Sequence, residues 1–268
     1  MNFLISAPFS FQITAILFFG LILGSFVNVC IHRLPKKKSI IFPGSHCMSC
    51  NEPISPRDNI PVFSYLLLNG KCRQCTKPIS AIYPINELIT ALLLLVGFIK
   101  LGISIKFLIF CIIGPALLTI SIIDIKHKII PDIITIPGIL FGLIAGSYSV
   151  GLKDSALGLI AGGSIFLIIS EIYYRIRGRI GMGGGDIKFI AAAGALVGVQ
   201  QVVLIVFISS FMGSLFGLVG LAGKKVNALS KIPFGPFLSG GTLIVYFWGE
   251  QIIQMYIMNI TGGIEFYR

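Results

Sequence analysis

Two of the few acidic residues in this 268-residue chain stand where an ordinary structural role does not explain them. Asp124 ends an apolar run, where a negative charge meets the unfavourable end of a helix dipole. Asp186 directly follows Gly183, Gly184 and Gly185, which no helix needs at its start. Two carboxylates held close together share a proton, so one can activate water while the other protonates a carbonyl oxygen. The pair indicates aspartyl hydrolysis, although ion-coupled transporters also gather carboxylates in helical bundles.

Other acidic residues near predicted helix ends have ordinary explanations. Asp132 follows Pro131 at a predicted helix start, where a carboxylate can cap amide groups and meets the favourable end of the dipole. Glu171 has Arg175 four residues later, which is the spacing of an ion pair on one helix face. We therefore expect neither carboxylate to take part in the chemistry.

A polar loop over residues 32–81 carries two C-x-x-C pairs, Cys47 with Cys50 and Cys72 with Cys75, separated by 21 residues. Each pair turns tightly enough to place both sulfurs on one tetrahedral ion, and this spacing is typical of a four-thiolate zinc site. Disulfides are the alternative, but they are rare in a reducing cytoplasm. A closed site of this kind is structural, so the zinc is expected to fold a loop too small for its own core.

The composition places these residues in a membrane protein. Hydrophobic residues make up 55% of the chain and charged residues only 12%, and several uncharged runs reach the roughly 20 residues that cross a bilayer. We predict an all-α polytopic membrane protein with about eight transmembrane helices and a small zinc-binding cytoplasmic loop domain. The predicted spans are residues 9–31, 83–99, 105–123, 133–152, 155–174, 187–199, 202–222 and 234–258.

The sixth and seventh of these spans come from one long uncharged run, which we divide near Gly198. Small residues also recur at four-residue spacing, a pattern typical of close contacts between membrane helices. The glycine pairs with this spacing are Gly20 and Gly24, Gly142 and Gly146, Gly158 and Gly162, Gly194 and Gly198, and Gly213 and Gly217.

The positions of the basic residues predict the orientation. If the loop after the first span is cytoplasmic, 17 of the 21 Lys and Arg residues lie inside, so both termini are expected outside. The first apolar run carries no preceding basic residue or cleavage site and is expected to be a retained span. The formal charge of +11 then reflects basic loops beside an anionic leaflet, and no motif indicates nucleic-acid binding.

Four segments in this order resemble the prepilin peptidases, also called type IV leader peptidases. "GGGD" at 183–186 fits the G-x-G-D motif of aspartyl intramembrane proteases, and "GMGGGDIKFIAAAGALVG" extends the match. The segments at 19–35, 47–87 and 123–137 resemble the family's N-terminal motif, its zinc-loop module and its first aspartate segment. Their sequences are "FGLILGSFVNVCIHRLP", "CMSCNEPISPRDNIPVFSYLLLNGKCRQCTKPISAIYPINE" and "IDIKHKIIPDIITIP".

The resemblance implies a bacterial inner-membrane enzyme that cuts the basic leader from prepilins or pseudopilins at the cytoplasmic face. It makes Asp124 and Asp186 the catalytic pair, supported by Gly183 and Gly185. It further implies that the new N-terminus is methylated from S-adenosylmethionine, with Asn59, Gly70 and Glu87 as candidates for methyl transfer.

The implied organisation is a first transmembrane helix over residues 1–31, a methyltransferase-associated zinc loop over 32–81 and a transmembrane aspartyl peptidase core over 82–268. One departure concerns Ile82, because the family usually carries arginine directly before its Tyr-Pro pair. Two alternatives stay open: a peptidase without methyl transfer, or a carboxylate-based ion-coupled transporter.

Overall fold

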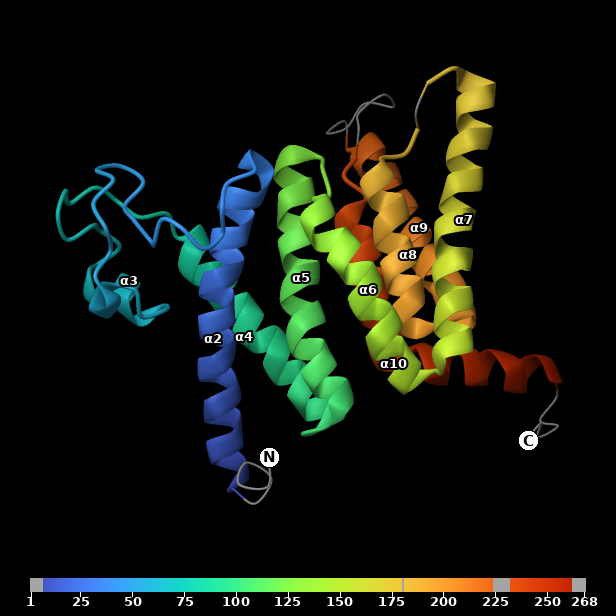
Figure 1. The fold of residues 1–268 in the computed structure, drawn as a ribbon, viewed down its shortest axis with the longest axis horizontal. Coiled ribbons are helices and arrows are strands. Elements are labelled where there is room, and N and C mark those ends of the chain that lie inside the picture. Colours follow the sequence, from blue (N-terminus) through green and yellow to red (C-terminus); the bar gives the residue numbers. More distant parts are fainter. Residues whose placement is uncertain (1–6, 180, 224–231, 262–268) are drawn as a thin grey trace. The chain divides into compact units, whose positions relative to one another are not determined.

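The computed structural model describes residues 7–179, 181–223 and 232–261, and within these ranges the regular structure is helical (Figure 1). The chain forms two compact units, Met1–Ile122 and Ile123–Arg268. This division follows packing. The three-part division predicted from the sequence, into a first helix, a zinc loop and a peptidase core, is based on function and stays a prediction.

The first unit contains two long helices, α2 (Phe9–Arg33) and α4 (Ile82–Leu101). It also contains most of α5 (Ile105–His127), whose last turn, from Ile123 on, belongs to the second unit. α2 lies directly on α4 because its glycines leave room for the partner backbone: a Cβ on Gly20 or Gly24 would come within 2.5 Å of the Cα atom of Ala91 or Glu87. Buried amides join the same helices, where Asn86 Nδ2 donates to Asn28 Oδ1 at 2.8 Å. Buried polar groups need such partners in an apolar surrounding.

Short elements punctuate the loop between α2 and α4: η1 (Leu34–Lys36), η2 (Pro56–Asp58) and α3 (Phe63–Leu67). Few of the loop's side chains are buried, so hydrogen bonds contribute much of its order. At its beginning, the Arg33 guanidinium donates to the carbonyl oxygens of Ser39 and Gly44, each at 3.1 Å.

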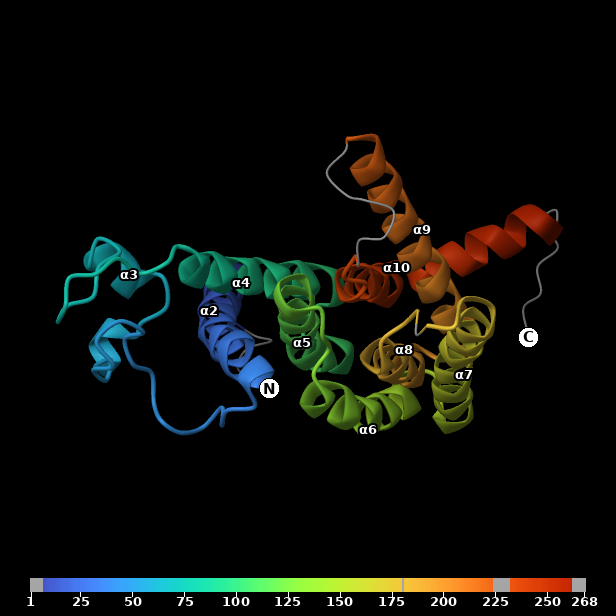
Figure 2. The same cartoon turned by 90° about the horizontal axis from the view of Figure 1, so that it is seen from above.

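The second unit contains five further helices, with α8 at its centre (Figure 2). Their bounds are α6 (Asp132–Ser149), α7 (Leu152–Arg177), α8 (Gly184–Val197), α9 (Val199–Ala222) and α10 (Gly235–Thr261). α8 contacts the other four helices and buries most of its length, including Ile190 and Ala195, which are fully inaccessible.

Glycines bring α6 and α7 against α8, which confirms the close contacts predicted from the small-residue spacing. A Cβ on Gly142 would lie 2.6 Å from the Ala192 carbonyl oxygen, and one on Gly162 would lie 2.5 Å from that of Ile190. The Ser155 hydroxyl adds a buried hydrogen bond to the Ala195 carbonyl oxygen at 2.5 Å. Backbones in such contact allow van der Waals packing without any large side chain.

All eight predicted spans overlap helices, and six helices are long and apolar enough to cross a membrane in the described part of the chain. These six are α2, α4, α5, α6, α7 and α9. The predicted break near Gly198 is confirmed, because α8 ends at Val197 and Gly198 has a φ of +88°, a conformation that glycine adopts readily. α8 has 14 residues and thus a length of about 21 Å, less than a bilayer core. The chain is a multi-pass helical membrane protein.

Candidate active site

Asp124 lies in the last turn of α5 and is only 5% exposed. Its Oδ2 accepts a buried hydrogen bond of 2.7 Å from the backbone N–H of Gly235, the first residue of α10. This contact explains why an acid stands at the unfavourable C-terminal end of its own helix: its carboxylate faces the N-terminus of another helix. A helix N-terminus presents free N–H groups and favours negative charge.

Asp186 is the third residue of α8, and its Oδ2 accepts the N–H of Gly183 at 3.2 Å. This is one half of a capping box, in which the third helical residue reaches back to the residue before the helix. The two carboxylates, Asp124 and Asp186, are near enough to interact electrostatically. Two acidic groups far apart in the sequence therefore share one region of the second unit, each with one oxygen on a backbone N–H.

The glycines before Asp186 differ from one another in their surroundings. A Cβ on Gly183 would lie 3.1 Å from Asp186 Oδ2, whereas one on Gly184 would meet nothing within 4 Å. On Gly185 it would lie 2.8 Å from Ile130 Cβ and 2.9 Å from the Ile130 carbonyl oxygen. Gly185 thus lets the start of α8 lie against the connection between α5 and α6, which follows Asp124.

Two acids that the sequence explained structurally have partners of their own. Asp132 begins α6 as predicted, but the expected cap is wrong: the start of α6 has no side-chain capping hydrogen bond. Instead, Asp132 Oδ1 accepts from Lys188 Nζ at 2.7 Å, an ion pair that the sequence did not indicate. Glu171 and Arg175 form the predicted pair on one face of α7, with 2.8 Å between Oε1 and Nε.

The four cysteines of the loop lie together, and their sulfurs are all within 4.8 Å of one another. A tetrahedral zinc ion with Zn–S distances of about 2.3 Å places its sulfurs about 3.8 Å apart, and Cys47 Sγ lies 3.9 Å from Cys75 Sγ. None of the four is in a disulfide. The donor set and its spacing fit zinc.

Two matching turns hold these cysteines. The N–H of Cys47 donates to the Glu52 carbonyl oxygen, and that of Cys72 donates to Lys77, each at 2.9 Å. The N–H of Ser49 also donates to Cys47 Sγ at 3.4 Å, a contact that favours the thiolate form that a metal requires.

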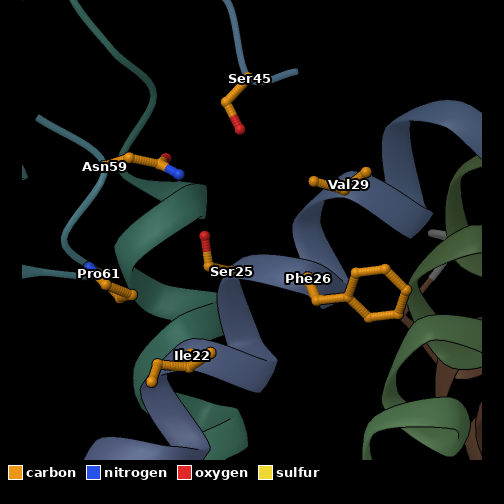
Figure 3. Close-up of a pocket in the computed structure, with 7 residues that line it drawn as sticks. All are labelled: Ile22, Ser25, Phe26, Val29, Ser45, Asn59 and Pro61. Atoms are coloured by element: carbon orange, nitrogen blue, oxygen red, sulfur yellow. The ribbon is translucent and has the colours of Figure 1, made fainter. Parts of the chain in front are cut away.

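A hollow of about 280 Å³ opens between α2 and the loop in the first unit (Figure 3). The hydroxyls of Ser25 and Ser45 and the amide of Asn59 point toward a common space. Apolar side chains complete the wall, namely Ile22, Phe26, Val29 and Pro61. A small polar group set inside an apolar wall is typical of sites for small molecules, and this volume is near the lower end for them.

Glu87 is not among the lining residues of this hollow, and it is 8% exposed. Its carboxylate accepts the N–H of Val62 at 2.7 Å and a hydrogen bond from Ser25. Val62 has a φ of +62°, which costs a branched residue on the order of 1–3 kcal/mol. Glu87 therefore fixes a strained turn next to the hollow and the hydroxyl that lines it.

The other methyl-transfer candidates lie differently. Asn59 lines the hollow, but Gly70 does not; its φ of +67° serves a turn in which its N–H donates to Tyr65 and its carbonyl accepts from Ile79. Ile82 begins α4, 46% exposed, and is not among the lining residues.

Sequence reasoning missed Gly235, Ser25 and Val62. Gly235 stands in "PFGP", where a glycine between prolines was the available signal. Ser25 and Val62 gave none, because their contacts depend on how α2, α4 and the loop pack.

The fold and these sites define a multi-pass helical membrane protein with a paired-carboxylate site and a four-cysteine loop. The comparisons identify it further: the bacterial peptidase A24 N-terminal domain matches residues 18–101, and the type IV leader peptidase family matches residues 108–218. The chain belongs to the type IV leader peptidase family, and it is an enzyme of that protease family.

Relatives of similar length carry the name prepilin leader peptidase/N-methyltransferase. The protein from Pseudomonas aeruginosa is 33% identical over 96% of this chain and 97% of its own length. The one from Aeromonas hydrophila is 34% identical over 90% and 92%, and the one from Bacillus subtilis 33% over 94% and 100%. No solved structure matches the chain.

Proposed function

We propose that the protein removes the leader peptide from prepilins or pseudopilins by aspartyl hydrolysis at Asp124 and Asp186. The observation that carries the proposal is the shared location of these two carboxylates in the second unit, each held by a backbone N–H. The names of the related proteins supply the substrate class. Membership in a protease family argues against the transporter alternative.

The proposed reaction uses the pair as base and acid in turn. The ionised carboxylate takes a proton from water while the oxygen of that water bonds to the peptide carbonyl carbon, and the protonated partner gives its proton to the carbonyl oxygen. The tetrahedral intermediate then breaks its C–N bond. The amine leaves with the proton that came from water. One hydroxyl of the intermediate returns its proton to the partner carboxylate as the new C=O bond forms, so the pair ends with one shared proton as it began.

The excess of basic residues in the predicted inner loops supports a site at the cytoplasmic face, with both termini outside. A prepilin leader is itself basic, so the net charge of that face does not favour leader binding. Among the loop acids, Asp58 already accepts two hydrogen bonds from Arg73, at 2.7 and 2.8 Å. Glu52 is the freer candidate for a leader contact.

We also propose that the protein methylates the new amino terminus, and that the hollow beside α2 is where this occurs. S-adenosylmethionine supplies the methyl group: the N–C bond forms, the S–C bond breaks, S-adenosylhomocysteine leaves and the amine releases a proton. In this proposal, oxygens of Ser25, Ser45 and Asn59, which line the hollow, accept N–H bonds from that amine and so orient its lone pair. Zinc on the four cysteines would fold the loop that carries two of these residues.

The test is mass spectrometry of a prepilin-like substrate, incubated with protein in nanodiscs and S-adenosylmethionine. Asp124→Asn and Asp186→Asn should each abolish leader removal, whereas Asp132→Asn, a nearby acid outside the pair, should retain it. Full cleavage by either of the first two variants would refute the dyad.

Methyl transfer is measured separately on a synthetic peptide that already has the mature N-terminus. Ser45→Ala and Asn59→Ala should lower its rate about tenfold or more, as expected for lost positioning. Ser49→Ala, an exposed serine in the same loop, serves as the matched control. Absence of any methylated product with the wild-type protein would leave the peptidase-only alternative.

A further inference from the structure

One backbone N–H group at the start of α10 has an unusual hydrogen-bond acceptor. The first residues of a helix have no acceptors within the helix and need partners elsewhere. The N–H groups of Phe237 and Leu238 both donate to the Phe234 carbonyl oxygen, at 3.1 and 3.0 Å, and Pro236 has no N–H. The remaining donor is Gly235, whose partner is the carboxylate of Asp124 on α5.

The lack of a side chain at residue 235 also needs a reason. Gly235 is not among the glycines with positive φ, so its backbone conformation does not call for glycine, and alanine is the better helix former. Space explains the glycine: a Cβ there would lie 2.8 Å from Asp124 Oδ2, 3.0 Å from its Cβ and 3.2 Å from its Cγ. The carboxylate lies flat against this residue, and a methyl group would displace it.

We propose that Gly235 is a positioning residue of the peptidase, which fixes one oxygen of Asp124 so that the other is presented to water and substrate. The inference rests on the proposed function of Asp124. In the described residues, the second oxygen of Asp124 makes no hydrogen bond, and the same holds for Asp186. Each carboxylate is thus anchored by one oxygen at a helix start and offers the other for reaction.

Anchoring matters because a carboxylate on a single Cβ can rotate about two bonds. A charge-assisted bond of 2.7 Å from a buried N–H removes much of that freedom before substrate arrives. Misplacing a catalytic group by about 1 Å can cost on the order of 100-fold in rate. A methyl group on residue 235 should therefore act on turnover and leave substrate binding nearly unchanged.

The test compares Gly235→Ala with Gly240→Ala, a glycine on the same helix whose added Cβ would meet only the flexible end of Met212 at 3.3 Å. We expect Gly235→Ala to lower kcat for leader cleavage by about tenfold or more, with KM within about twofold and the same thermal unfolding midpoint as the control. Wild-type kcat in Gly235→Ala overturns the proposal. A loss of cleavage activity that is fully explained by a smaller fraction of folded protein also overturns it.

A second comparison removes the anchored group instead of its neighbour. Asp124→Asn keeps an oxygen acceptor for the Gly235 N–H and should unfold at the wild-type temperature, whereas Asp124→Ala leaves that N–H unpaired and should unfold earlier. Equal midpoints for the two variants overturn the contact. If Asp124→Asn cleaves normally, the proposed function fails; if Asp124→Asn is inactive while Gly235→Ala is normal, only the present inference fails.

Discussion

The cysteine site and the aspartate site solve the same problem, holding reactive side chains together, in opposite ways. The cysteines come in pairs three residues apart, and matching backbone turns aim each pair inward with few buried side chains around them. The aspartates come from separate helices and depend on backbones that touch at glycines. The loop should therefore depend on its metal, and the aspartate site on small volumes inside the helix packing.

Metal removal gives the largest expected difference between the two sites. Cys72→Ser takes away one of four thiolates, and we expect loss of bound zinc and a fall in methyl transfer of roughly 100-fold. Leader cleavage should stay within about threefold, because the backbone hydrogen bonds that hold Asp124 and Asp186 both lie within the second unit. Zinc content by elemental analysis and both rates are measured together, with Cys111→Ala, a cysteine of α5 outside the cluster, as the control. A parallel loss of cleavage would mean that the sites are not separable.

Helix packing gives the opposite pattern. Gly158 on α7 touches the backbone of Gly194 on α8, so Gly158→Val forces the helices apart and should destabilise the second unit by about 1–3 kcal/mol or more. Leader cleavage should fall together with the stability of the second unit, while zinc stays bound to the loop. Gly163→Ala is the control on the same helix, since its Cβ would meet Ala191 at an ordinary 3.5 Å. Unchanged thermal unfolding of Gly158→Val would contradict the packing argument.

A single methyl group near Asp186 sharpens the comparison further. Gly185→Ala would press on Ile130 and shift the start of α8, so cleavage should fall about tenfold. Gly184→Ala faces open space and should keep nearly full activity. The pair is measured by initial cleavage rates at matched folded protein. Equal rates for the two variants would show that residue 185 has no special requirement.

The sequence predicted the features that depend on residues close together in the chain or on long hydrophobic runs. The helices, the break at Gly198 and the glycine contacts are set by hydrophobic length and by small residues at four-residue spacing. The clustering of the cysteines follows from their two pairs, because each C-x-x-C turn is a local structure.

The contacts of the site residues could not be predicted in the same way. The partner of Asp124 is the N–H of Gly235, far along the chain, and no periodicity links the end of α5 to the start of α10. Glu87 could be noted as an acid at membrane depth, but its bond to Val62 depends on a strained turn in the loop. Such contacts are products of packing between elements, which the spacing of residues in a sequence does not encode.

The smallest expected effect belongs to an ion pair in the loop. Arg73, half-exposed, holds the pKa of the Asp58 carboxyl below its usual range through two hydrogen bonds. Because the pKa is lowered, the pair contributes its full stabilisation to the loop at pH values above the unfolded-state pKa of Asp58. This stabilisation is lost as the pH falls through the lower folded-state pKa. At neutral pH the pair is therefore fully formed, but solvent screens it.

Asp58→Asn should accordingly weaken zinc retention by no more than about threefold at low salt, and by less in 1 M salt, where the screening length is about 3 Å. Competition with a chelator at neutral pH measures this, and salt is a better variable than acid because acid also protonates the cysteines. An effect as large as that of Cys72→Ser would mean that the turns alone do not hold the loop. A small, salt-sensitive effect would mean that the metal and the backbone hydrogen bonds keep this loop ordered. The aspartate site differs, because there one added methyl group is expected to decide activity.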